Sequence, residues 1–553
     1  MLSKFFRLYW TVRYLTVKQV YYRLYYRFKK PVVPFIEDVE LFLEGNGVDI
    51  TLQWNGFSYK EQLIENNEAT FLNKRVSINR AQVWNYEGLE KLWLYNLHYF
   101  DDLCSSNSIE RFVVHKRLVH RWIDENPPCI GNGWEPYTLS LRIVNFIKWS
   151  SKLGYKDKRF LASVYQQSEA LLQQCEYHIL ANHLFANGKA LIFSGIYFGG
   201  LGEKFLQKGL EILDSEFKEQ FLEDGAHFEL SPMYHSVMLW DVLELIELAQ
   251  VSNNEKLLKR VEVWKAVAAK ALSWLESMIH PDGEISFFND AAMGIAASPA
   301  TISKYAQSLN ISLKESGTEK YICHMDSGFS VIDRQSLKLL INHADISPSY
   351  QPGHAHADSL SFELSLMGKR VFVNSGTSMY GVSKQREAER GTSMHNTVTI
   401  DNLNSSEVWS GFRVARRANS YIDVVENTPK KLILDMYHDG YTRLNSKYVH
   451  KRVLSVEENC ICLSDSIPVS PPESVYAHYH LHPDIIVSAL SSSSLLLKHK
   501  KNDRIIISLE IINATFTVER YKYHPEFGIS IDSNKLVLQC IDTLKPFSVL
   551  MKW

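Results

Sequence analysis

The sequence predicts an α+β chain in which a region of helical hairpins, a toroid or a bundle, precedes an antiparallel β-sandwich. From about residue 80 to 300, apolar residues recur at helical spacing in one segment after another. From about Cys323 onward they alternate in short runs separated by turn residues, which is typical of antiparallel strands. With 553 residues, 45% of them hydrophobic and 22% charged, the chain can bury a large core. We therefore expect three parts: residues 1–35, 36–315 and 316–553.

The helical part is predicted from stripes of apolar residues three and four positions apart. Each stripe marks one buried helix face, and the short polar links between stripes favour hairpins of helices. The clearest stripes are Leu139, Ile143, Phe146, Ile147 and Leu153; Met238, Val242, Leu245, Ile246 and Ala249; and Leu257, Val261, Trp264, Val267 and Leu272. Before them, residues 74–81 predict a short strand, and Pro31 and Pro34 are expected to end a first helix.

The β part is predicted from alternating runs and turns. Leu360, Phe362, Leu364 and Leu366 alternate, which predicts a half-buried strand. The turn at 367–370 joins this run to 371–374 and predicts a hairpin. Other strands are expected at 328–332, 339–341, 396–401, 431–437, 448–456, 459–465, 503–509, 513–519 and 535–541.

Composition excludes some classes of function. The formal net charge of -2 argues against a nucleic-acid-binding protein that depends on positive charge. The seven cysteines show neither zinc spacing nor a disulfide framework, which favours a reducing compartment. No signal-peptide core and no transmembrane span is evident, so we expect a cytoplasmic or inner-envelope location, with the periplasm as the alternative.

The first thirty residues interleave basic and aromatic side chains and contain no acid. Two interpretations remain open. The segment is either a basic amphipathic helix on an anionic membrane or partner, or a helix docked on the body of the protein. The number of aromatic rings that need burial favours docking, and peripheral membrane contact through residues 1–30 is the alternative.

Four short stretches are more polar than their apolar surroundings: residues 180–188, 224–235, 353–358 and 390–398. In the third, His354, His356 and Asp358 alternate directly before the predicted strand. On a strand, side chains two positions apart face the same side, which suits proton transfer or metal binding. A pair of surface histidines in a loop is the simpler interpretation.

Together these stretches resemble the heparinase II/III-like polysaccharide lyases, a family that includes alginate and oligoalginate lyases. The resemblance covers most of the chain and implies an (α/α) toroid followed by an antiparallel β-sandwich, with the active site in the cleft between them. It rests on five motifs in order: A-N-H-L-x-x-N-G at 181–188, F-E-L-S-P-x-Y-H at 228–235, G-H-x-H-x-D at 353–358, N-S-G-T at 374–377 and H-N-T-V at 395–398.

The resemblance implies β-elimination at a 4-linked uronate, in which the C5 proton is removed and the C4–O bond breaks. A proton beside a carboxylate is very weakly acidic, so hydrogen bonds must first damp the charge of that carboxylate. By resemblance, Asn182 and His183 do this. Tyr234 matches the general acid and base, His354 the base or an orienting group, and Tyr380 more loosely a second tyrosine of the alginate-degrading branch.

The family often binds one zinc ion, and the matching residues here are His356, Asn374 and His395. Asn374 departs from the family, which has an aspartate there. Because an amide oxygen is a poorer zinc ligand than a carboxylate, the residues leave two interpretations open. They hold a metal weakly, with a structural role, or Asn374 hydrogen-bonds the imidazoles. Asp358 is expected to support the site without binding a metal.

An anionic polysaccharide or oligosaccharide is the expected partner. Candidates for contacting it by charge or by stacking are Arg390, Glu229, Trp93, Asn96, His98, Tyr99, Trp134 and Tyr137, although packing is the more common role of each type. A hydrolase and a non-catalytic glycan-binding protein of polysaccharide assembly are the alternatives. Ser359 stands where the metallo-β-lactamase motif needs a histidine, and nothing marks Glu229 and Asp358 as the paired carboxylates of a glycosidase.

Overall fold

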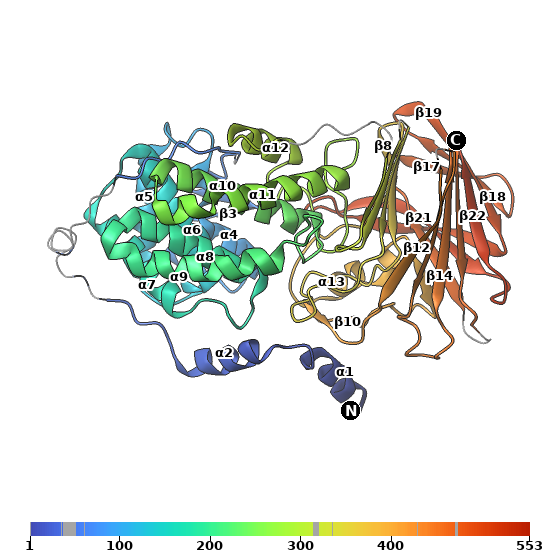
Figure 1. The fold of residues 1–553 in the computed structure, drawn as a ribbon, viewed down its shortest axis with the longest axis horizontal. Helices are drawn as coiled ribbons and strands as arrows, with labels where there is room; N and C mark the ends of the chain where they lie inside the picture. The colour runs from blue at the N-terminus through green and yellow to red at the C-terminus, as the bar shows by residue number, and fades with distance from the viewer. Residues whose placement is uncertain are drawn as a thin grey trace.

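Helices fill one half of the molecule and antiparallel sheets fill the other (Figure 1). The computed structural model describes residues 2–34, 36, 42, 51–59, 61–312, 320–334, 336–428, 430–469 and 474–553. Among the described residues, the last helix of the helical half ends at Ser308 and the first strand of the sheet half begins at Lys320.

The helical half consists of long helices joined by short links. Several begin with a polar cap: Asp157 accepts a hydrogen bond from the backbone of Phe160, and Ser231, followed by Pro232, accepts one from the backbone of Tyr234. The helices are α4 (Lys91–Tyr99), α5 (Phe112–Glu125), α6 (Pro136–Leu153), α7 (Lys158–Gln173), α8 (Ala181–Phe198), α9 (Glu203–Gln220), α10 (Pro232–Ser252), α11 (Glu255–Met278) and α12 (Pro299–Ser308). A small sheet of β1 (Ile64–Glu65), β2 (Glu68–Phe71) and β3 (Lys74–Ser77) precedes them.

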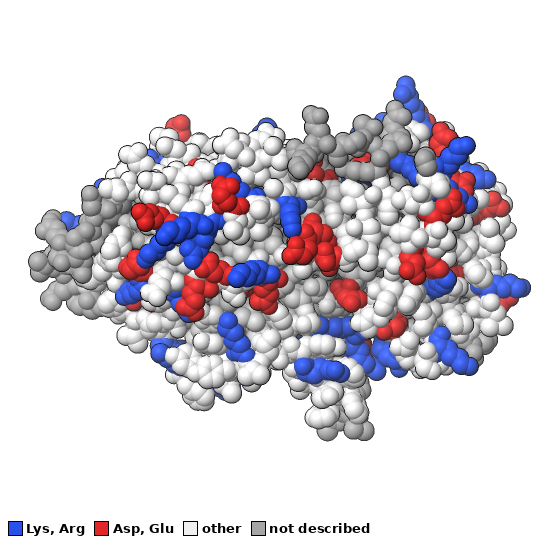
Figure 2. All heavy atoms as spheres, viewed as in Figure 1, with Lys and Arg blue, Asp and Glu red and all other residues white. Residues whose placement is uncertain are grey.

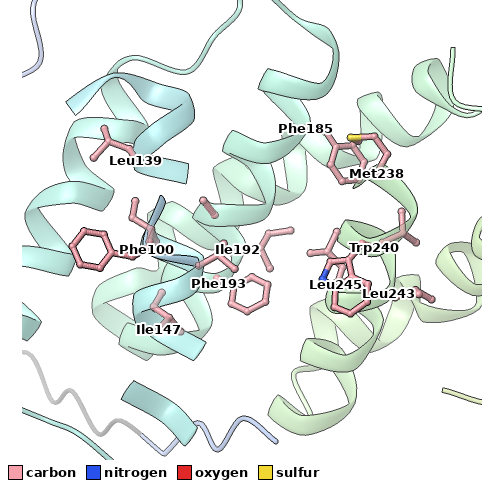
Figure 3. Close-up of a cluster of buried hydrophobic side chains, with 14 of the residues drawn as sticks. Phe100, Leu139, Ile147, Phe185, Ile192, Phe193, Met238, Trp240, Leu243 and Leu245 are labelled. Atoms are coloured by element: carbon pink, nitrogen blue, oxygen red, sulfur yellow. The ribbon is translucent and has the colours of Figure 1, made fainter. Parts of the chain in front are cut away.

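Helix α8 is the centre of this half, buried along nearly its whole length. Figure 3 shows its side chains, among them Ile192 and Phe193, between side chains of α6 and α10. On its other side α9 approaches very closely, and a Cβ on Gly195 would lie 2.6 Å from the backbone nitrogen of Leu206. Only glycine permits this approach, which fixes the position of α8 and of the residues at its start.

The sheet half contains three antiparallel sheets whose side chains meet in one core. The five-stranded sheet has the order β4 (Lys320–His324), β5 (Phe329–Arg334), β6 (Leu337–Asn342), β7 (Phe362–Leu366), β8 (Lys369–Phe372). The four-stranded sheet has the order β20 (Ala514–Tyr523), β21 (Ile531–Cys540), β16 (Val475–His480), β9 (Val398–Ile400). The eight-stranded sheet has the order β12 (Ser420–Asn427), β13 (Leu432–His438), β14 (His450–Glu457), β15 (Cys460–Ser466), β22 (Phe547–Lys552), β19 (Asn502–Ile512), β18 (Ser494–His499), β17 (Ile485–Ala489). Helix α13 (Lys384–Glu389) and the ribbon of β10 (Val408–Trp409) and β11 (Arg413–Val414) lie near the boundary between the halves (Figure 1).

The structure corrects the expected strand at 360–366. Residues 353–358 lie in turns, and β7 starts only at Phe362. All five residues of β7 are buried, because its alternate face, with Glu363 and Ser365, packs against His280 of the helical half. The hairpin prediction is confirmed: β7 and β8 pair through a turn in which Met367 and Gly368 both have positive φ.

The N-terminal segment forms two helices, α1 (Leu2–Val12) and α2 (Val17–Phe28), which run along one side of both halves (Figure 1). The expected single helix ended by prolines is wrong, because Thr16 and Gln19 form a capping box that starts α2. Docking is confirmed for α2: Gln19 is buried and donates to the carbonyls of both Ile179 and Tyr350. Several aromatic rings nevertheless stay exposed, including those of Phe5, Phe6, Tyr9 and Tyr21. In the described part of the chain, no helix combines the length and the apolar character that crossing a membrane requires.

Candidate active site

The predicted catalytic residues converge at the boundary between the helical half and the sheet half. The hydroxyl of Tyr234, on α10, lies 2.9 Å from that of Tyr380. The ring of Tyr234 stacks on that of His354 with 3.9 Å between centroids. His354 Nε2 lies 3.8 Å from Glu229, which accepts the amide of Asn182. These residues, with His183 and Asp290 described below, form what we call the candidate cluster.

Asn182 lies in the first turn of α8, after two residues in unusual conformations. Leu180 and Ala181 both have positive φ, which costs free energy for residues with a Cβ and recurs at functional sites. This backbone turn directs the Asn182 amide nitrogen to both oxygens of Glu229, each 2.9 Å away. The amide that was expected to meet a substrate carboxylate is therefore held by an internal carboxylate instead.

His183, the next residue, is better placed to meet an anion. Its ring packs on Tyr137 with 4.4 Å between centroids, and 28% of its side chain is exposed. Its Nδ1 lies 2.9 Å from Glu176, so Nε2 faces away from that partner. Burial alone would lower the pKa of His183, but the Glu176 carboxylate outweighs burial and raises the pKa above the ordinary value of 6.5.

The two tyrosines hold their protons firmly in the free protein. Burial, followed by the neighbouring Tyr380 hydroxyl, raises the pKa of Tyr234 well above its ordinary value. The pKa of Tyr380 is also raised well above its ordinary value, mainly by burial, although the guanidinium of Arg386 opposes this. The pair is therefore protonated in the free protein, and the Arg386 guanidinium, 4.9 Å from the Tyr380 ring, favours any negative charge that forms there.

Asp290 connects the groups of the cluster, and the sequence reasoning missed it. Its Oδ2 lies 2.8 Å from His354 Nδ1, and its Oδ1 lies 2.8 Å from His356 Nε2. Arg386 of α13 binds both oxygens, with NH2 2.6 Å from Oδ2. Burial would raise the pKa of Asp290, but Arg386 and the two imidazoles outweigh burial and keep the pKa well below its ordinary value. Asp290 is thus a carboxylate that fixes the orientation of His354.

A signal for Asp290 exists in the sequence. Asn289 and Asp290 are a polar pair directly after Phe287 and Phe288, the same contrast that marks the other polar stretches. Asn289 has a positive φ, donates to the carbonyl of Leu230 and accepts the backbone N–H of His356. The pair therefore links the start of α10 to the histidine turn.

His356, His395 and Asn374 form a chain that continues from Asp290. His356 Nδ1 lies 3.2 Å from His395 Nε2, and His395 Nδ1 lies 3.0 Å from the Asn374 amide. Burial lowers the pKa of His356 to about 4 and that of His395 well below its ordinary value, so both rings are neutral. Since His356 donates to Asp290, it must accept from His395, whose Nδ1 then needs a donor. A half-turn of the amide supplies the Asn374 nitrogen, which otherwise is buried without a partner.

In this structure the three residues expected to bind zinc are hydrogen-bonded to one another in a row. His395 turns one nitrogen to His356 and the opposite one to Asn374, so the three donors do not converge on one point. Among the residues described, no group of three or more His, Cys, Asp or Glu side chains is arranged to hold a metal ion. An asparagine in place of an aspartate is what the chain requires, because only the amide can donate to His395.

Two further polar residues support the histidine turn from within. Arg390 is fully buried and donates to the carbonyl of Ala355 at 2.9 Å and 3.1 Å. In this structure the Arg390 side chain has no exposed surface, and it positions the turn that carries His354. Asp358 is also buried, and burial raises its pKa to about 7.

Most of the expected sugar-stacking residues belong to the core. Trp93, His98 and Trp134 are at most 5% exposed, and their ring nitrogens hydrogen-bond internal groups. Tyr99 is buried as well, beside Tyr137 and close enough to Tyr234 to raise its own pKa further. Asn96 is half-buried and donates to the carbonyl of Leu92. Glu229 is 1% exposed, so its carboxylate contacts Asn182 and His354 and does not face the solvent.

Two family models match the chain, one on each side of this cluster. The model described as heparinase II/III N-terminus matches residues 121–312, and the one described as heparinase II/III-like, C-terminal matches residues 324–540. The chain belongs to the heparinase II/III-like family. The N-terminal part contributes Asn182, Tyr234 and Asp290 to the cluster, and the C-terminal part contributes His354 and Tyr380, so the cluster needs both parts.

Heparinase-like relatives agree with this assignment. Heparin-sulfate lyases of Bacteroides stercoris and Pedobacter heparinus are 25% and 26% identical over 55% and 51% of this chain. The matches cover 46% and 47% of those proteins, so the chain spans about half the length of the curated relatives it matches. A crystal structure of heparinase III, at 15% identity, has a TM-score of 0.70 and covers 97% of this chain and 89% of its own. That likeness shows a common fold.

Proposed function

We propose that this protein is a polysaccharide lyase that cleaves a uronic-acid-containing glycan by β-elimination. The observation that carries the proposal is the contact of three groups suited to proton transfer: Tyr234 against Tyr380, and both beside a His354 that a buried carboxylate orients. The family supports the same chemistry, because the relatives named above are heparin-sulfate lyases. Heparan-, alginate- and exopolysaccharide-like uronates are all within the proposed class.

The first requirement of the reaction is to damp the charge on the substrate carboxylate. We assign this to His183, whose raised pKa favours a cation and whose side chain is 28% exposed. Asn182 can add its amide only by exchanging Glu229 for the substrate. Such an exchange would free Glu229 to move toward His354. Substrate binding at Asn182 is therefore coupled to the contact between Glu229 and His354.

The second requirement is proton transfer. His354 Nδ1 donates to ionised Asp290, which leaves the Nε2 lone pair as the base for the C5 proton. The C5–H electron pair becomes the C4–C5 double bond, and the C4–O pair leaves on the departing sugar oxygen. Tyr234, which keeps its proton in the free protein, donates it to that oxygen, and Tyr380 stands behind Tyr234 as its hydrogen-bond partner. Atoms and charges balance without a covalent enzyme intermediate.

For the architecture, we propose that the helices of residues 36–315 form an (α/α) toroid and that residues 316–553 form a β-sandwich. The succession of antiparallel helix pairs and the single core shared by three antiparallel sheets support this, as does the fold shared with heparinase III. The preceding residues, 1–35, then fasten the two domains together through α2.

The experiment is a screen of uronate polymers, followed by ultraviolet absorbance of the conjugated double bond that only elimination creates. We expect absorbance to rise on at least one of heparan sulfate, hyaluronate, alginate or a bacterial exopolysaccharide. Tyr234→Phe should reduce the rate by on the order of 10²-fold or more. New reducing ends without absorbance would show hydrolysis instead, and binding without either signal would show a glycan-binding protein.

A further inference from the structure

A second concave site lies between the N-terminal helix and the sheet half. It is a cavity of about 560 Å³, within the range of small-ligand sites. Trp10 and Tyr14 line it on the N-terminal side, and Arg416, Arg417 and Arg443 line it on the other. None of its lining residues belongs to the candidate cluster. We call it the N-terminal pocket.

The pocket has more positive than negative charge. Arg416 is neutralised by Glu407, which it binds with two nitrogens at 2.7 Å. Arg443 donates to three backbone carbonyls, among them that of Ser405 at 2.8 Å. Asp345 is the lining carboxylate, and it accepts a backbone N–H at 2.8 Å. Within the described residues, no carboxylate lies at ion-pair distance from Arg417.

Arg417 is the group with unused binding capacity. Its guanidinium lies 3.7 Å above the ring of Tyr14, and NH1 donates to the carbonyl of Ser349 at 2.7 Å. Its Nε is buried and has no hydrogen-bond partner. Burial lowers the pKa of Arg417 only to about 10, so the side chain remains a cation at neutral pH. A half-buried guanidinium without a counter-ion favours an anionic ligand that brings one.

The aromatic wall is fixed in place. Trp409 donates its ring N–H to the hydroxyl of Thr11 at 3.1 Å, which holds α1 against the sheet half. Trp10 and Tyr14, four positions apart, are half-buried, whereas Tyr9 on the same helix is 52% exposed. Figure 2 shows Lys and Arg side chains where α1 meets the body of the molecule. Aromatic rings beside guanidinium groups bind the apolar face and the carboxylate of an acidic sugar together.

We propose that the N-terminal pocket binds an acidic sugar residue of the same polysaccharide, outside the catalytic cluster. This choice of ligand rests on the proposed lyase function. Two chain segments connect the pocket with the cluster. Residues 349–354 run from the pocket wall to His354, and residues 412–417 begin with Phe412, whose ring lies 6.2 Å from that of His354. A long glycan held in the pocket is therefore kept near the cluster, which favours long chains over short ones.

The test is calorimetric binding of acidic oligosaccharides to the full chain carrying Tyr234→Phe, which prevents turnover. Adding Arg417→Gln should weaken the binding of a long uronate oligosaccharide about tenfold or more, the effect of losing a charge-assisted hydrogen bond. Adding Trp10→Ala should also weaken it, because the aromatic ring against which the sugar packs is lost. The matched controls are Arg413→Gln, on the same surface but outside the pocket, and Tyr9→Ala on the same helix; both should stay within about twofold. Arg417→Lys, which keeps the charge, should lie between, and thermal melting checks that each variant folds.

Five outcomes decide the proposal. Equal affinity of the pocket variants and their controls would overturn it, and so would equal binding of a neutral glucose oligomer of the same length. Arg417-dependent binding of inorganic phosphate, or of phosphatidylserine vesicles in preference to the uronate, would assign the pocket to a phosphate group instead. If absorbance rises in the wild type while pocket variants bind normally, the pocket proposal fails and the lyase stands. If pocket-dependent binding is seen without elimination, the lyase proposal fails and the pocket stands.

Discussion

Replacing Asp290 by asparagine tests whether one buried carboxylate both orients His354 and neutralises Arg386. Asp290 and Arg386 are both fully buried. Asp290→Asn keeps the size of the side chain and removes the charge, which leaves a guanidinium without an anion in the interior. Removing one partner of a buried ion pair costs about 3–5 kcal/mol of folding free energy. Activity should fall about 10³–10⁴-fold, because an amide can donate toward His354 as well as accept from it and therefore no longer fixes its tautomer.

The two effects are separated by a double variant. In Asp290→Asn/Arg386→Met the unpaired cation is absent, so most of the lost stability should return, while activity should stay low. Stability is measured by urea unfolding at pH 7, and activity by the rate of double-bond formation on the substrate that the screen identifies. The reasoning is refuted if the free energy of unfolding of Asp290→Asn lies within about 1 kcal/mol of the wild-type value. It is also refuted if the activity of the double variant lies within tenfold of the wild-type activity.

Three other predictions concern the histidine chain, the N-terminal helix and a buried glutamate. The donors of His356, His395 and Asn374 do not converge on one point, so protein purified without chelator should contain no stoichiometric zinc. Adding a chelator should change neither the melting temperature nor the reaction rate. One zinc ion per chain would contradict this prediction. Gln19→Ala removes hydrogen bonds to both halves and should cost about 1–3 kcal/mol and speed hydrogen exchange in α2, whereas Val17→Ala, at an exposed position of the same helix, should do neither. Burial, then Glu219, raises the pKa of Glu216 to about 7. The folded protein thus holds this proton more tightly than the unfolded chain, and stability is lost as pH rises from 4.5 to 7. Glu216→Gln should therefore be more stable than the wild type by on the order of 1–3 kcal/mol at pH 8 and equal to it at pH 4; a gain independent of pH would contradict the assignment.

Local patterns predicted the parts of this molecule that depend on short-range physics. Apolar spacing located the long helices, and the turn at 367–370 located the hairpin of β7 and β8, because both depend on neighbouring residues. The pattern of β7 was misread because alternation cannot show that the polar face is also buried; Glu363 and Ser365 find their partner in His280, more than eighty positions earlier.

Long-range contacts limited what the sequence could show of the site. The motifs identified Asn182, Tyr234 and His354, and the structure brings them together. Asp290 lies 64 positions from His354, and no local period relates the two. The tryptophans Trp93 and Trp134 were open to a stacking role only because a sequence does not reveal which aromatic rings pack in the core.

The most direct test of elimination is the fate of water during cleavage. The protein is incubated with an acidic oligosaccharide in ¹⁸O-labelled water, and the masses of the fragments are measured by mass spectrometry. Elimination adds no water, so the masses of the two fragments should sum to that of the substrate, apart from slow exchange of oxygen at the reducing ends, and neither fragment should gain the mass of a water. Tyr234→Phe and His354→Ala should give the same products far more slowly. Fragments heavier by one labelled water would show hydrolysis and contradict the role given to the C5 proton.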